Sequence, residues 1–297
     1  MNQVIFRNLE ELNREQKQNN LCGFLLDTSN VKSESMKQNL ILGLHSYEII
    51  SYSIIILSAL LFIVLERMFP YNKGQRVLRE GFFNDFALYT IAQSYILGII
   101  IFTFIIKWID ESSGVSRLQL FANVPIWLQL VFFTLTHDLY IYLMHRFMHS
   151  NKYLWRLHEA HHSPKTVDWL SGSRSHAFEI LINQTVEFLP IVLLGAPPEV
   201  AAYKGVISGI WGMYIHANLG INTGWMQKII NGPEMHRIHH TTGKGRNKNF
   251  ATKFAFWDWI FGTAYLPEER ANKYGLKTFF PANFFKQFTF AFRSYKK

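Results

Sequence analysis

The sequence predicts an all-α integral membrane protein with about three transmembrane helices, a membrane-inserted helical hairpin and a cytoplasmic, histidine-rich metal-binding cap. Two observations support this fold class. The 297 residues are 49% apolar and 16% aromatic, yet the mean hydropathy is near zero, as expected when long apolar runs alternate with polar segments. In addition, eleven of the twelve histidines lie between residues 137 and 240, where an even distribution would place about four.

Three uncharged runs are long enough to cross, or nearly cross, a bilayer, which requires about 20 apolar helical residues. They cover residues 49–65, 86–106 and 118–136. The short loop between the first two runs is basic, with Arg67, Lys73, Arg76 and Arg79. Because positively charged loops stay in the cytoplasm, this loop sets the orientation of all three spans. The third span then ends on the cytoplasmic side.

A helical hairpin is predicted after the third span. Two apolar stretches, residues 177–194 and 200–219, flank a Gly-Ala-Pro-Pro turn at 195–198. Glu179 and Glu187 make the first stretch a poor full span, so we expect a hairpin that dips into the bilayer and returns to the side it left. This topology brings the surrounding polar segments to one face of the membrane.

Three histidine boxes occupy those polar segments. The first is the pair His145 and His149, and the second and third share the spacing H-x-x-H-H at residues 158–162 and 236–240. On a helix, residues three and four apart share a face, so each box points several imidazoles into one space. All-imidazole ligation suits Fe, Zn, Cu or Ni, and so many histidines in one place imply two ions.

The boxes and the segments around them resemble the fatty acid hydroxylase/sterol desaturase superfamily of membrane oxidoreductases. The matching stretches are residues 137–149, 158–164, 168–176, 216–218, 236–240 and 257–263. The resemblance implies a di-iron centre on the cytoplasmic side. It also implies that O₂ and external electrons are used to hydroxylate or desaturate a lipid, a sterol or another apolar substrate. Of the two reactions, hydroxylation is the expected one.

The resemblance also assigns the metal ligands. They are His145, His149, His158, His161, His162, His216, His236, His239 and His240, with His176 and His137 as weaker candidates. Some members carry a further histidine four residues before the position of His216, where this chain has Gly212. Asp138 is a candidate to hold an imidazole by its second N–H, because ligating histidines usually have such a partner.

The domain prediction divides the chain into three parts. Residues 1–45 are a polar N-terminal arm, in which Ile5, Leu9 and Leu12 are spaced for a short amphipathic helix or belong to a frayed end. Residues 46–265 are the membrane-embedded hydroxylase or desaturase domain, and residues 266–297 are a basic C-terminal tail. Since the arm is too short for a fused haem domain, a separate reductase or electron carrier is expected.

Charge and cysteine content restrict partners and location. The net charge of +9 suits cytoplasmic loops and contact with anionic lipid, and no basic stripe interleaved with aromatic residues indicates nucleic acid. The single cysteine, Cys22, excludes an internal disulfide. The expected location is the inner membrane of a bacterium or the endoplasmic reticulum of a eukaryote.

Two other functions fit parts of the pattern. The second box also reads H-E-x-x-H, the motif of zinc peptidases in which a glutamate, here Glu159, is the general base. A membrane peptidase would leave most of the histidines unexplained, and the third box has Arg237 at the corresponding position. A histidine-rich metal transporter is the second alternative, although transporters place their ligands near the bilayer midplane.

Overall fold

The computed structural model describes residues 40–41, 44–268 and 270–294, and it divides the chain into two compact units, Met1–Ile50 and Ser51–Lys297. In the first unit, β1 (Leu40–Ile41) and β2 (Leu44–His45) form an antiparallel pair in which Leu40 is opposite His45. The helix predicted around Ile5, Leu9 and Leu12 lies outside the described residues. Apart from this small pair and two isolated bridges, the described chain is helix and loop.

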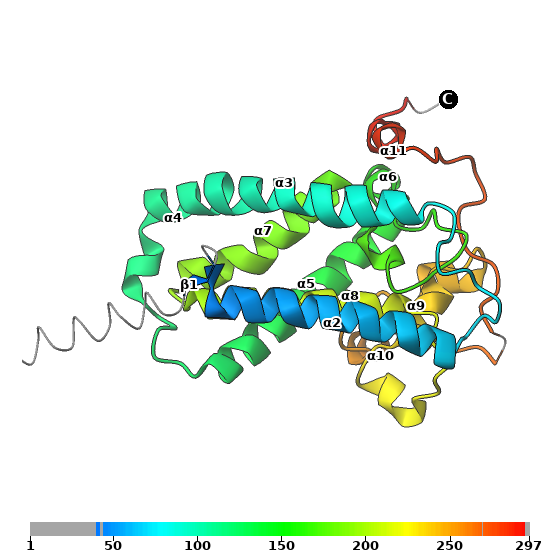
Figure 1. Cartoon of the computed structure of the whole chain (residues 1–297), viewed down its shortest axis with the longest axis horizontal. Coiled ribbons are helices and arrows are strands. Elements are labelled where there is room, and N and C mark those ends of the chain that lie inside the picture. The colour runs from blue at the N-terminus through cyan, green and yellow to red at the C-terminus, as the bar shows by residue number, and fades with distance from the viewer. Residues whose placement is uncertain (1–39, 42–43, 269, 295–297) are drawn as a thin grey trace, which may run out of the picture. The chain divides into compact units, whose positions relative to one another are not determined.

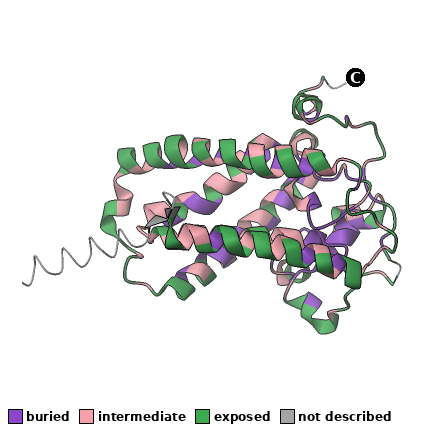
Figure 2. Cartoon of the chain, in the orientation of Figure 1, coloured by how far each residue is buried: buried purple, intermediate pink, exposed green. Residues whose placement is uncertain are grey.

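Three helices are long and apolar enough to cross a membrane, which confirms the predicted number. They are α2 (Ser46–Met68), the continuous helix Asn84–Ser113 and α5 (Ile126–Ser150). In the most apolar window of the first two, only 11% and 28% of the residues are buried. Figure 2 shows the resulting exposed faces along both helices. Such large exposed apolar faces are expected of helices surrounded by lipid.

The second span combines two kinds of helical turn. It consists of η1 (Asn84–Gln93), α3 (Ser94–Ile99), η2 (Ile100–Ile106) and α4 (Lys107–Ser113), and both η segments are π-helical. From Asp85 to Ile101 its buried side chains follow every fourth residue, at Asp85, Tyr89, Gln93, Leu97 and Ile101, and Ile106 is buried five residues later. A π-helix has more than 3.6 residues per turn, so a spacing of four keeps these side chains on one face. The span thereby presents one continuous inner face.

The third span begins later than predicted. The run 118–136 was expected to be helical throughout, but α5 starts at Ile126, directly after Pro125. Residues 115–118 form the 3₁₀ turn η3 (Val115–Leu118), and Gln119 adopts a left-handed conformation with φ 52°. Proline disfavours the helical conformation of the residue before it, which separates the apolar loop from the helix. At the other end, α5 continues through the first histidine box.

The predicted hairpin is present. It comprises α7 (Ala177–Leu193) and α8 (Pro198–His216), and the turn between them uses Gly195 at φ 71°. The acidic residue Glu187 is buried within the hairpin, where its carboxylate binds Lys204 and accepts a hydrogen bond from Ser208. A charge is tolerated in the apolar run because it is paired there. Immersion of the hairpin in the bilayer stays a prediction.

Short helices and turns gather at one end of the long helices (Figure 1). They are α6 (Lys152–His158), η4 (Ser171–Ser173), η5 (Gly224–Lys228), α9 (Pro233–His239), η6 (Lys244–Asn247), α10 (Phe256–Ile260) and α11 (Phe284–Phe290). Figure 2 shows that buried residues concentrate in the loops and around α9 at this end. The histidine boxes lie in this part of the protein.

A buried network of ion pairs fixes the loops around the histidines. The Arg79 guanidinium contacts Asp85 at 2.6 Å and Asp168 at 2.8 Å, and Arg174 contacts Asp85 at 2.6 Å. Buried charges are tolerated only when their partners are close and fully hydrogen-bonded. The network therefore ties the loop before the second span to the segment that follows the second box.

The described part of the predicted C-terminal tail packs onto the rest of the second unit. Tyr274 accepts a hydrogen bond from Arg237 at 3.0 Å, and the Tyr89 hydroxyl donates to Gln287 at 2.6 Å. These contacts place α11 beside the second span. The domain boundary at residue 265 stays a prediction.

Candidate metal centre

The nine histidines predicted as ligands come together in two groups. The first group is His145, His149, His158, His162 and His239, and the second is His161, His216, His236 and His240. Within each group the potential ligand nitrogens all lie within 4.8 Å of one another. Eight of the nine side chains are buried, and His149 is half-buried. The structure thus contains two neighbouring sets of inward-facing imidazoles.

The second and third boxes each contribute to both groups. Residues four apart stay together, so His158 and His162 belong to the first group and His236 and His240 to the second. The remaining member of each box crosses over: His161 joins the second group, and His239 joins the first. The third box lies in α9 up to His239, where adjacent residues point about 100° apart because an α-helix has 3.6 residues per turn. In the second box α6 ends at His158, and the turn that follows carries His161 and His162. One H-x-x-H-H segment thus serves two sites.

Oxygen atoms hold the outer nitrogen of most rings. The Nδ1 partners are the carbonyls of Phe250 for His145, Arg174 for His161, Gly212 for His216 and Lys248 for His239, and the side chains of Asn247 for His149 and Glu179 for His158. Since a carbonyl or carboxylate oxygen accepts, each Nδ1 carries the proton and donates. The inward Nε2 then carries the lone pair that a metal ion binds.

The distances between inward nitrogens fit metal ions. His216 Nε2 lies 3.2 Å from His161 Nε2 and 3.0 Å from His236 Nε2. In the first group, His162 Nε2 lies 3.1 Å from His239 Nε2. Two lone pairs facing each other repel, and a shared cation removes this repulsion. With metal–nitrogen bonds of about 2.1 Å, ligands at right angles lie about 3.0 Å apart and tetrahedral ligands about 3.4 Å apart.

Burial keeps these rings neutral and ready to bind a metal. It lowers the pKa of His158 and of the five histidines at 161, 162, 236, 239 and 240 well below the ordinary value, because a charged imidazolium is poorly solvated there. Charge on neighbouring rings lowers the same pKa values further. A site of neutral imidazoles carries no negative charge of its own, and it suits a borderline transition metal.

The two weaker candidates lie outside both groups. His176 caps α7, accepting from the Phe178 N–H, and its other nitrogen donates to the Phe288 carbonyl at 3.0 Å. His137 Nε2 lies 3.3 Å from the Asn183 carbonyl. It precedes His145 by eight residues, so it sits about 12 Å further along α5. Both histidines have structural partners instead.

Asp138 was predicted to bond to an imidazole, but its carboxylate bonds to residues 252–254. Its carboxylate accepts hydrogen bonds from the Thr252 hydroxyl and from the backbone N–H groups of Lys253 and Phe254, at 2.7 to 2.9 Å. Its described partners include no imidazole, so the predicted direct contact is wrong. The residue holds the segment that follows Phe250, whose carbonyl accepts from His145.

Glu179 is the carboxylate that sequence reasoning missed. Its Oε1 lies 2.9 Å from Nδ1 of His158. The sequence offered one indication, an acidic residue inside an apolar stretch next to the boxes, but that residue was interpreted only as an obstacle to membrane crossing. Four other rings are held by backbone carbonyls, which every residue type has, so no side chain in the sequence indicates these partners.

Glu159 does not occupy the position of a peptidase base. Its carboxylate forms an ion pair with Arg293, with a second contact of 3.0 Å to the same guanidinium. It belongs to neither histidine group. The geometry required of a zinc peptidase is therefore absent from the second box.

The Phe250 ring covers the first group, and Asp258 fixes the turn that carries this ring. The Phe250 ring lies 5.3 to 5.6 Å from the rings of His145, His149 and His239. Asp258 accepts from the N–H groups of Phe250 and Ala251 at 2.8 and 2.9 Å, which fixes this turn.

Comparison with known proteins shows which family this region resembles. Residues 130–263, a little under half of the chain, match the fatty acid hydroxylase family. The match spans all nine clustered histidines, and the predicted resemblance to this superfamily is confirmed. No solved structure matches the chain.

Proteins similar to this chain are named as hydroxylases and monooxygenases. Ornithine lipid hydroxylase OlsE of Rhizobium tropici is 27% identical over 73% of this chain and 67% of its own length. Alkylglycerol monooxygenase of Danio rerio is 33% identical over 47% and 31%, and methylsterol monooxygenase 1-3 of Arabidopsis thaliana is 32% identical over 50% and 52%. The chain thus spans about a third and about half of the latter two. These names bear out the predicted enzyme class.

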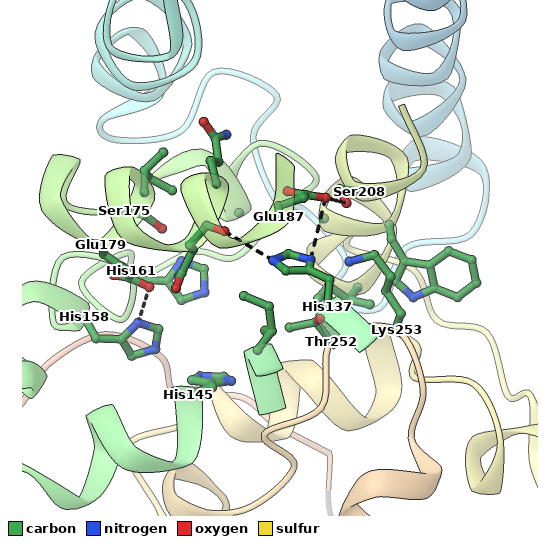
Figure 3. Close-up of a pocket in the computed structure, with 18 of the residues that line it drawn as sticks. His137, His145, His158, His161, Ser175, Glu179, Glu187, Ser208, Thr252 and Lys253 are labelled. Atoms are coloured by element: carbon green, nitrogen blue, oxygen red, sulfur yellow. Dashed lines mark hydrogen bonds and ion pairs between the residues drawn. The ribbon is translucent and has the colours of Figure 1, made fainter. Parts of the chain in front are cut away.

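A cavity of about 220 Å³ lies beside the two histidine groups (Figure 3). Five of the nine clustered histidines line it, namely His145, His158, His161, His216 and His236. Its walls come from α5, α7, α8 and the 252–253 segment. Ile141, Ile180 and Ile215 make part of the wall apolar, so the cavity can admit a hydrocarbon segment.

Proposed function

We propose that the protein is a membrane-bound di-iron monooxygenase that hydroxylates a lipid-like substrate. In this reaction one oxygen atom of O₂ enters a C–H bond and the other leaves as water, at the expense of a pair of external electrons and a pair of protons. The observation that carries the proposal is the convergence of nine imidazoles in two groups within the region that matches the fatty acid hydroxylase family. Hydroxylation is favoured over desaturation because the named relatives are hydroxylases and monooxygenases.

Iron is the metal that suits this site best. Bound iron would supply the redox chemistry that O₂ reduction and C–H oxidation need, which zinc lacks. Nδ1 hydrogen bonds to the chain's own oxygen atoms hold six of the nine rings with Nε2 facing inward. They also bury the site from water, with Phe250 over the first group.

A lipid-like substrate agrees with the position of the cavity. The cavity opens among helices that include a candidate span, α5, and the predicted membrane hairpin. A hydrocarbon chain could therefore reach the histidines from the bilayer without crossing water. The lipid and sterol names of the relatives support the same substrate class.

Electrons from a separate carrier would enter beside Trp155. Its ring lies 4.9 Å from the His149 ring and 5.2 Å from the His162 ring, and the Arg246 guanidinium covers it at 4.1 Å. The depression around this tryptophan contains five basic residues, Lys152, Arg156, Arg246, Lys277 and Arg293, against one acidic residue, Glu159. A carrier with an acidic surface would dock there, because complementary charge steers association.

The electron route can be tested with variants that affect either the docking of the carrier or the transfer of its electrons to the metal site. Arg246→Gln and Lys277→Gln should slow reduction by an acidic ferredoxin-type carrier most at low salt, since added salt screens the attraction. Trp155→Leu should slow reduction at every salt concentration. Exposed Lys228 lies outside this depression, so Lys228→Gln serves as the control. Equal rates for all variants would contradict this route.

We place the metal site on the cytoplasmic side. Arg67 at the end of α2 and Lys73 and Arg76 in the loop that follows are exposed, and they supply the positive charge that the positive-inside rule counts. Arg79 is buried in ion pairs and does not contribute to that rule. Inner membrane or endoplasmic reticulum stays the expected location. Labelling of Cys substitutions at Lys73 from either side of sealed vesicles would determine the orientation.

The activity itself is testable in whole cells. Cells that express the protein would be grown under ¹⁸O₂, and their lipids compared by mass spectrometry with those of cells that express His161→Ala. We expect one ¹⁸O atom in a lipid that only the active protein produces. Desaturated lipids without the label would favour desaturation, and a new peptide cleavage pattern would favour the peptidase.

A further inference from the structure

The end of the cavity away from the two histidine groups is polar and charged. His137, Asn183, Gln184, Glu187, Ser208 and Lys253 line it. Figure 3 shows His137, Glu187 and Ser208 together on one side of the cavity, with Lys253 beside them. A cavity that received only hydrocarbon would not need charged groups at this depth, because burying charge without a partner is costly.

Lys253 is the cation at this end without a bonded partner. The residue is 6% exposed, and among the described residues no hydrogen bond or ion pair involves its Nζ. Its backbone N–H is fixed by Asp138 at 2.9 Å, so the side chain starts from a rigid position. Figure 3 shows this side chain on the cavity wall next to His137.

Each carboxylate around Lys253 bonds to another group, although Glu187 and Glu179 do so through Oε1 alone. Glu187 binds Lys204 and Ser208, with Nδ1 of His137 3.7 Å away. Asp138 accepts from the Thr252 hydroxyl and two backbone N–H groups. Glu179, the other acidic residue of the cavity, holds His158 at 2.9 Å. The Lys253 ammonium therefore faces the cavity with its hydrogen-bonding capacity unused.

We propose that Lys253 binds an anionic group of the substrate, a carboxylate or a phosphate, and so selects acidic amphiphiles over neutral ones. This inference rests on the proposed function, because it concerns the substrate of the same site. The ammonium donates to the anionic oxygens, and the hydrocarbon part of the ligand lies along the apolar wall toward the histidines. Lys253 is thus a specificity residue that does not touch the metal site.

The arrangement also fixes the approximate reach of such a ligand. Lys253 is held at the level of Asp138, seven residues before His145 on α5, which corresponds to about 10 Å of helix rise. The volume of about 220 Å³ is smaller than the ~300–1,000 Å³ of pockets that enclose a whole small ligand. Only the acidic end and a short hydrocarbon segment fit inside, and the rest of a lipid would extend outward.

Binding of matched probes tests the proposal without turnover. Dodecanoate, dodecyl phosphate and 1-dodecanol share one chain length and differ in the terminal group. Their affinities would be measured by isothermal titration calorimetry with metal-loaded protein in nanodiscs, under anaerobic conditions. We expect at least one of the two anions to bind ten-fold or more tighter than the alcohol. The anion that binds tighter identifies the acidic group.

Three variants complete the experiment. Lys253→Met should bind all three probes alike, Lys253→Arg should keep the preference for the anion, and Lys228→Met, at an exposed lysine outside the cavity, should behave as the wild type. Equal binding of anion and alcohol by the wild type would overturn the proposal, as would a preference that survives in Lys253→Met.

Metal content of the same samples separates the two proposals. Iron present with no preference for anions would overturn the role of Lys253 and leave the proposed oxygenase function intact. A preference for anions that depends on Lys253 in a protein that binds no iron would overturn the oxygenase function and support the anion site.

Discussion

Replacing Glu179 by leucine should weaken metal binding at the first histidine group and leave the second group intact. The Glu179 carboxylate lies 2.9 Å from Nδ1 of His158, and both side chains are buried. Without it, Nδ1 loses its acceptor, the ring is free to turn, and the buried N–H is left unsatisfied. Loss of such an outer partner lowers metal affinity about 10- to 100-fold, which corresponds to about 1.4 to 2.7 kcal/mol.

The assay is iron retention during titration with a chelator, followed by Mössbauer spectroscopy of the protein-bound iron. Glu179→Leu should release one of two irons at a 10- to 100-fold lower chelator concentration than the wild type, while Glu179→Gln, which keeps an acceptor oxygen, should lie between them. Glu111 is an exposed acidic residue on α4, so Glu111→Leu serves as the matched control. Retention unchanged within two-fold, or equal loss at both groups, would refute the reasoning.

Three further predictions concern the scaffold and the metal-free state. Arg79→Met breaks the buried pairs with two aspartates and should lower the free energy of unfolding by about 3–5 kcal/mol. Thermal unfolding in mild detergent would measure this loss. Arg76 is exposed, so Arg76→Met serves as a near-neutral control. In Gly172→Ala, the added Cβ would lie 2.8 Å from His216 Nδ1, so metal should be lost from the second group. Gly98→Ala adds a Cβ with no neighbour within 4 Å and should keep its metal. Metal analysis of both variants tests this difference. Finally, the metal-free protein should lose stability as the pH falls below about 6.5, because burial depresses the folded-state pKa of the histidines and the unfolded chain then binds more protons. The expected slope is about 1.4 kcal/mol per pH unit for each histidine that charges, measured by denaturant unfolding from pH 7.5 to 5.5, and a flat profile would contradict it.

The sequence predicted those features that depend on local pattern. The apolar run 86–106 lies within the helix Asn84–Ser113, and the Gly-Ala-Pro-Pro turn separates α7 from α8 as expected. The resemblance to the superfamily, together with the spacing of the boxes, predicted which histidines would cluster. The start of α5 was predicted too early, because the apolar residues before Pro125 were assigned to the helix although they form a loop.

The remaining features depend on contacts between distant segments. Asp138 bonds to residues 252–254, more than a hundred positions away, and its sequence neighbourhood offered no sign of this. The division of the second box between two groups depends on where α8 and α9 bring His216 and His236. Likewise, the carbonyls that accept from Nδ1 atoms can belong to any residue type.

The most direct test of the central claim is the metal content of the purified protein, measured by elemental analysis and Mössbauer spectroscopy. The two histidine groups predict about two irons per chain. His161→Ala should lose iron from the second group and retain more in the first. One zinc per chain, with no iron bound even after anaerobic reconstitution, would contradict the di-iron account.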